Sequence, residues 1–102
     1  TRKIISPGQL KKHYSPKTPI RLNAKKPLKN EAYLSFGKSK ITNSSSLNLS
    51  PNGDLKEAAF NLFDFLRKLD KLNKARIAIS SIPNIGIGKT INERLKRASH
   101  YG

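Results

Sequence analysis

The residues with the clearest chemical potential lie in one stretch, residues 81–95, which has the sequence SIPNIGIGKTINERL. The pattern is typical of a strand end, a glycine-rich turn and the start of a helix. Gly88, Lys89 and Thr90 match the end of a phosphate-binding loop, in which backbone N–H groups and a lysine surround the phosphates of a nucleotide. The stretch therefore raises the hypothesis of a nucleotide site.

Three features of the sequence argue against a nucleotide site in this stretch. The motif requires glycine five positions before Gly88, where this chain has Pro83, which lacks an N–H group and has restricted backbone angles. A phosphate-binding loop also needs an acid at the end of another strand to hold magnesium, but the strands expected at residues 19–24 and 32–37 end in Ala24 and Gly37. Domains that hydrolyse nucleotides in this way are also larger than 102 residues. We therefore interpret Gly86 and Gly88 as a tight turn that lets the last helix start close to the strand.

No other catalytic or metal-binding arrangement is indicated. The two histidines, His13 and His100, each lie near a terminus, and the six acids are spread along the chain without a Ser–His–Asp pattern. The absence of cysteine excludes disulfides and thiolate metal sites. No apolar run is long enough to cross a membrane, so we expect no membrane contact and a cytoplasmic location.

The clearest expected element is a helix over residues 54–73. Asp54 is placed to cap its first turn, and Glu57 has the spacing that completes a capping box. Phe60 falls among the charged residues of this helix, opposite its broad apolar face, which comprises Leu55, Ala58, Ala59, Leu62, Phe63, Phe65, Leu66 and Leu69. A second helix is expected from about Lys89, with an apolar stripe of Ile87, Ile91, Leu95 and Ala98.

Strands are expected at residues 19–24, 32–37 and 75–83. Residues 38–53 are rich in serine and asparagine and are expected to form loop with a short extended piece at 47–49. The helix between the second strand and 75–83 predicts that these two strands are parallel. The sequence thus indicates an α/β fold with a mainly parallel sheet and two main helices.

The net charge of +15 is concentrated toward the N-terminus, with +10 in residues 1–40 and +5 in residues 41–102. A basic excess of this size attracts nucleic acid by neutralising phosphates, or it serves solubility alone. No run of basic residues is longer than two, and few aromatic residues are available to stack on bases. A free-standing basic RNA-binding module therefore stays open as an alternative function.

Three blocks, in order, resemble one family, the two-domain threonylcarbamoyl-AMP synthases. SPGQLKKHYSPKTPIRL (6–22) resembles the family's interdomain linker. NLSPNGDLKEAAFNLFDFLRKLD (48–70) and IPNIGIGKTINERLKRAS (82–99) are similar to two blocks of its C-terminal domain. The family's glycine turn needs no lysine, so the resemblance of residues 82–99 is to a turn and not to a nucleotide site.

The resemblance implies that residues 1–18 are an interdomain linker and that residues 19–102 are a small Rossmann-like, three-layer C-terminal domain. The usual helix between its first two strands is squeezed out, because residues 25–31 are too few for one. The chain begins with Thr1 and not Met, so we expect it to be part of a longer protein whose YrdC-like catalytic domain is absent here.

In the family, a nucleotidyltransferase reaction joins ATP, L-threonine and bicarbonate into threonylcarbamoyl-AMP, and partner proteins then use this intermediate to modify tRNA. The resemblance implies that ATP and Mg²⁺ bind to the catalytic domain and that the C-terminal domain binds no cofactor. The implied partners are the catalytic domain of the same polypeptide and tRNA or tRNA-modification proteins. The isolated chain is expected to be inactive.

The linker of the family resembles a lid over the active site of the catalytic domain. Carried onto this chain, the lid candidates are Ser6, Pro7, Gly8, His13, Tyr14 and Pro16. Pro7 and Gly8 would turn the chain, Pro16 would stiffen it, and His13 and Tyr14 would offer ring faces and hydrogen-bond donors. The alternative is that these residues only dock the linker.

Overall fold

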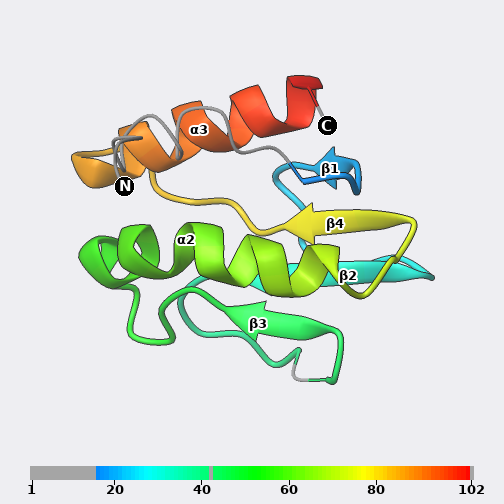
Figure 1. Ribbon diagram of the computed structural model, residues 1–102. Coiled ribbons are helices and arrows are strands. Elements are labelled where there is room, and N and C mark those ends of the chain that lie inside the picture. Colours follow the sequence, from blue (N-terminus) through cyan, green and yellow to red (C-terminus); the bar gives the residue numbers. More distant parts are fainter. Residues whose placement is uncertain (1–15, 42, 102) are drawn as a thin grey trace, which may run out of the picture.

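A sheet of parallel strands forms the centre of the structure, a computed structural model that describes residues 16–41 and 43–101 (Figure 1). In chain order the elements are β1 (Ile20–Arg21), β2 (Glu31–Ser35), β3 (Ser46–Asn48), α2 (Leu55–Asp70), β4 (Arg76–Ile79) and α3 (Ile87–Tyr101). The strands lie in the order β1-β4-β2-β3, and each neighbouring pair is parallel. The predicted α/β class and the parallel pairing of β2 with β4 are therefore confirmed.

The alternation of side chains along β2 and β4 divides the buried residues between the two faces of the sheet. Tyr33 of β2 lies opposite Ala78 of β4, and both belong to a small cluster on one face. The residues before and after them point to the other face and are buried in the main core: Ala32, Leu34, Ile77 and Ile79. Every residue of β2 is buried, as expected for a parallel strand covered on both sides.

Both helices cover the face of the main core. Helix α2 runs across β2 and β3, α3 lies beside β1, and the two helices contact each other (Figure 1). They contribute the buried residues Ala58, Leu62, Leu66 and Leu69 from α2, and Ile91, Leu95 and Ala98 from α3. The core is thus closed by residues of this chain alone, and Phe60 lies outside it with 87% of its surface exposed, as its place among the charges predicted.

The opposite face of the sheet is covered by two irregular segments. The connection between β1 and β2 has no helix, and its Ala24 packs with Tyr33, whose hydroxyl donates to the carbonyl oxygens of Ala24 and Lys25 at 3.4 and 3.3 Å. After β2, Ile41 packs on the same cluster. The three layers are therefore helices, sheet and irregular chain, so the three-layer domain is confirmed with loops in place of helices in its third layer.

The N-terminus of α2 is capped differently from the predicted capping box. Asp54 does cap the helix, since its carboxylate accepts from the N–H of Lys56 at 2.9 Å. Glu57, however, accepts from the hydroxyl of Ser50 at 2.6 Å, and that hydroxyl accepts from the N–H of Asp54 at 2.9 Å. The fully buried Ser50 thus relays the bond that the capping box would make directly.

The observed elements are shorter than predicted where the backbone turns. Strand β1 has two residues in place of 19–24, because Asn23 adopts a positive φ of 55° and interrupts the extended backbone. The N–H of Ala24 still donates to the carbonyl oxygen of Ile79 in β4 at 2.8 Å. Helix α2 ends at Asp70 and not at 73, because the N–H groups of Leu72 and Asn73 donate to carbonyl oxygens three residues back, at 3.1 and 3.3 Å, and not four. Asn73 then has a φ of 55°, which no helix continues. Helix α3 begins at Ile87, two residues before the prediction, and Glu31 is the first residue of β2 and not part of a loop.

Candidate functional site

Most of the predicted lid residues lie outside the residues that the structure describes: Ser6, Pro7, Gly8, His13 and Tyr14. The sixth, Pro16, is described and is buried. The chain that follows it leads directly into the sheet, because the carbonyl oxygen of Pro19 accepts from the N–H of Ile77 in β4 at 2.8 Å. The structure therefore places residues 16–19 against the rest of the described chain.

Asp70, the last residue of α2, holds Lys17 and Thr18. Its carboxylate accepts three hydrogen bonds, from the N–H of Lys17 at 3.1 Å, the N–H of Thr18 at 2.9 Å and the hydroxyl of Thr18 at 2.6 Å. Burial alone would raise the pKa of Asp70, but the hydrogen bonds from Thr18 and Lys17 outweigh it, so the pKa lies below its usual value. This contact was not predicted from the sequence, because it joins residues more than fifty positions apart.

Replacing Asp70 by alanine is expected to lower the free energy of unfolding by about 2 kcal/mol, since it leaves the buried Thr18 without the acceptor of two hydrogen bonds. Asp64→Ala is the matched control on the same helix. Its carboxylate is about half exposed and pairs with Arg67 and Lys68 at the surface, so its loss should cost about 0.5 kcal/mol or less. Urea denaturation would measure the free energy of unfolding of both variants. Equal losses would show that Asp70 does not anchor Lys17 and Thr18.

Two N–H groups of the glycine turn before α3, those of Gly88 and Lys89, are paired within the loop. The N–H of Gly88 donates to the carbonyl oxygen of Ile85 at 2.7 Å, and that of Lys89 donates to Gly86 at 3.1 Å. These donors would have to point at the phosphates in a phosphate-binding loop. Gly86 has a φ of +49°, which favours glycine, and a Cβ on Gly88 would collide with the carbonyl oxygen of Pro83. The geometry is that of a tight turn.

Glu31 joins two arginines on the face of the sheet opposite the helices. Its side chain is fully buried and accepts from Arg21 at 2.8 and 3.0 Å, from Arg76 at 2.8 Å and from the N–H of Leu28 at 2.7 Å. The hydrogen bonds from Arg21 are the main reason that its pKa is lowered to about 2. Because the carboxylate is ionised and both its oxygens are occupied, Glu31 is suited to holding the sheet together and not to moving protons.

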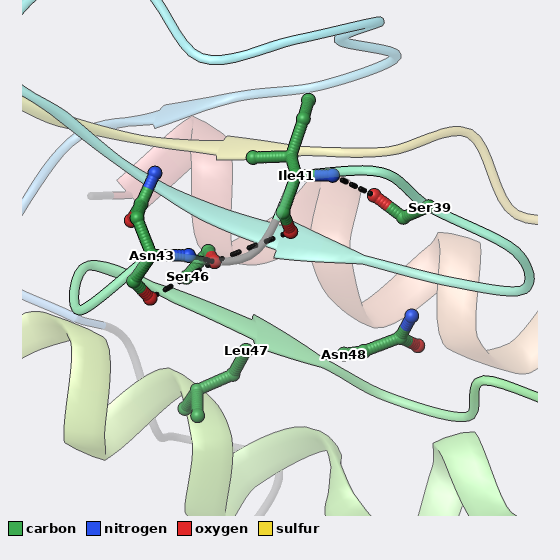
Figure 2. Close-up of a pocket in the computed structure, with 6 residues that line it drawn as sticks. All are labelled: Ser39, Ile41, Asn43, Ser46, Leu47 and Asn48. Carbon is green, nitrogen blue, oxygen red and sulfur yellow. Dashed lines mark hydrogen bonds between the residues drawn. The ribbon is translucent and has the colours of Figure 1, made fainter.

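A small pocket of about 250 Å³ lies beside β3 (Figure 2). It is lined by uncharged residues, Ser39, Ile41, Asn43, Ser46, Leu47 and Asn48. The N–H of Ile41 donates to Ser39, and the hydroxyl of Ser46 donates to the carbonyl oxygens of Ile41 and Asn43 at 3.5 and 3.2 Å. These polar groups hold the loop in shape, so the pocket shows no chemistry of its own.

The described residues show neither a metal-binding cluster nor a membrane-spanning helix. No group of three or more histidine, cysteine or acidic side chains in residues 16–41 and 43–101 is close enough to hold a metal ion. In the same part of the chain, no helix has the length and apolar character needed to cross a membrane.

The parallel sheet, the helices on one face and the docked N-terminal segment together define a small three-layer α/β domain. The model of the family described as threonylcarbamoyl-AMP synthase, C-terminal domain, matches residues 1–100. The chain therefore belongs to this family, as the three sequence blocks indicated. No curated protein and no solved structure matches the chain significantly.

Proposed function

We propose that the chain is the C-terminal accessory domain of an L-threonylcarbamoyladenylate synthase and that its linker covers the active site of the YrdC-like catalytic domain of the same polypeptide. The observation that carries the proposal is the family match over residues 1–100, which includes the linker as well as the folded domain. The parent enzyme would make threonylcarbamoyl-AMP from ATP, L-threonine and bicarbonate, releasing pyrophosphate. It would act in the cytoplasm and serve tRNA modification together with partner proteins.

The physical role of the folded domain is to anchor one end of the lid. Asp70 fixes residues 17 and 18, and Pro16 is buried, so the linker leaves the domain from a defined point. The lid residues Ser6, Pro7, Gly8, His13 and Tyr14 precede that point in the chain. A closed lid would exclude water from threonylcarbamoyl-AMP, a mixed anhydride that water hydrolyses. ATP and Mg²⁺ would bind to the catalytic domain, which supplies the chemistry.

The test compares the 102-residue chain with the full-length protein that contains the catalytic domain. The isolated chain should form no threonylcarbamoyl-AMP from ATP, L-threonine and bicarbonate. In the full-length protein, replacing His13 and Tyr14 together by alanine should lower product formation about tenfold and raise the fraction of ATP lost to AMP without product. Product formation by the isolated chain, or an unchanged full-length variant, would contradict the proposal.

A second candidate function, a basic RNA-binding module, is favoured by the charge of the described N-terminal region. Residues 17–40 carry seven lysines and arginines, and the charge of their only acid, Glu31, is neutralised by two arginines. Titration of the chain with tRNA at low and physiological salt separates the two functions. Tight binding that survives physiological salt would favour the module, whereas binding lost on adding salt would be charge attraction alone.

A further inference from the structure

An open cleft of about 450 Å³ lies at the carboxyl ends of β2 and β4, between the sheet and the segment that follows β2. Its floor includes Ser35, the last residue of β2, and Ser80, the residue that follows β4, and Phe36 and Ile41 also line it. The volume is in the range of sites that hold a small ligand such as a mononucleotide.

The topology of the sheet also favours a ligand at this place. Strands β2 and β4 are neighbours, but the chain leaves them in opposite directions. After β2 it continues to β3 on one side, and after β4 it enters α3, which contacts β1 on the other side. In parallel α/β sheets, ligands bind at the carboxyl ends of the strands where the connections diverge in this way.

The positive charge around the cleft favours the binding of an anionic ligand. Lys25, Lys38 and Lys40 line it, all three are exposed, and no acid is among the lining residues. None of the three lysines forms an ion pair within the described residues. Glu31, the acid of β2, lies at the amino end of that strand, about 13 Å from its carboxyl end, and two arginines neutralise it.

The hydroxyl groups of the floor are held by long hydrogen bonds. Ser35 donates to the carbonyl oxygen of Leu47 at 3.3 Å, and Ser80 donates to that of Ser81 at 3.3 Å. These distances exceed the 2.7–2.8 Å or so that is typical of O–H···O bonds, so rotation toward an anion would cost each hydroxyl little. Lysine ammonium groups around hydroxyl donors are a common way to hold a phosphate group.

We propose that this cleft binds the phosphate group of a mononucleotide-sized ligand, with Lys38 and Lys40 as its main contacts. This binding departs from the expectation that the C-terminal domain binds no cofactor. It does not depend on the lid, because its residues lie in the folded domain and can be tested in the 102-residue chain, whose core is closed by its own residues.

The experiment is a titration of the ¹⁵N-labelled chain followed by amide resonances, with AMP as the probe and adenosine as the uncharged control. AMP should shift the amides of residues 35–40 and 80–81, inorganic phosphate should shift the same amides more weakly, and adenosine should leave them in place. Equal shifts with adenosine, or AMP shifts confined to other residues, would overturn the proposal.

Two charge-matched double variants distinguish a specific binding site from general attraction of AMP to a basic protein. Lys38→Glu with Lys40→Glu should weaken AMP binding about tenfold or more. The control, Lys56→Glu with Lys89→Glu, changes the net charge by the same amount. Its two residues lie in the first turns of α2 and α3, so it should change the affinity for AMP by no more than about twofold. Equal weakening by both would overturn the proposal, as would binding of a short RNA oligonucleotide at this cleft without binding of AMP.

Discussion

Replacing Gly88 by alanine is expected to lower the free energy of unfolding by about 3 kcal/mol or more. Helix propensity alone predicts the opposite, because Gly88 lies in the first turn of α3 and alanine stabilises helical positions by up to about 1 kcal/mol over glycine. The added Cβ, however, would overlap the carbonyl oxygen of Pro83 and would lie 3.1 Å from its carbonyl carbon. Since both are backbone atoms, the start of α3 would have to move away from the strand.

Gly86→Ala is the matched control in the same turn. Gly86 has a φ of +49° but no atom within 4 Å of an added Cβ, so alanine would meet backbone strain without a collision. The expected cost is about 1 kcal/mol. Urea denaturation of both variants tests the order of the two effects. If Gly88→Ala is as stable as the original chain or more so, close packing of α3 against the Pro83 backbone is not what requires glycine there.

The helices were predictable because the apolar periodicity that indicates each helix lies within one continuous segment of the chain. The apolar face of α2 repeats every three or four residues, and its observed buried residues are all among those predicted. Gly86 and Gly88 were likewise identified as a turn from their local sequence. The strands were less well bounded, because the end of β1 depends on the backbone angle of Asn23, which its sequence neighbours do not dictate.

The contacts that hold residues 17 and 18 and those that hold the sheet were not predictable, because each joins residues far apart in the chain. Asp70 binds Thr18, and Glu31 binds Arg76 in the register set by the pairing of β2 with β4. A single sequence shows that these residues are charged but not which strands are neighbours. The anion cleft has the same origin, since Lys25, Lys38 and Ser80 meet only after the sheet has formed.

Stability of the chain is expected to fall steeply as the pH is lowered from about 4.5 toward 2, mainly because of Glu31. The pKa of Glu31 is about 2 in the folded chain, against an ordinary value of 4.5. A carboxylate with a lowered pKa stabilises the folded state fully above its unfolded pKa, and this contribution is lost as the pH falls toward the folded value. The size of this pKa shift sets an upper limit of about 3 kcal/mol on the contribution of Glu31 to the free energy of unfolding.

Solvent screening reduces this value, because the side chains of Arg21 and Arg76 are 33% and 49% exposed even though that of Glu31 is fully buried. We therefore expect Glu31 to contribute about 2 kcal/mol at neutral pH. Asp70 also has a lowered pKa, so it acts in the same direction and must be separated from Glu31.

Glu31→Gln provides that separation, because glutamine keeps the shape of the side chain and removes its charge. At pH 6 to 7 the variant should be less stable than the original chain by about 2 kcal/mol, since the two arginines lose their ionised partner. Toward pH 2 the original Glu31 becomes protonated as well, so the two stability curves should converge while Asp70 contributes equally to both. Urea denaturation between pH 2 and 7 measures the difference. A difference that stays constant over this range would mean that the charge of Glu31 is not what holds Arg21 and Arg76 to the sheet.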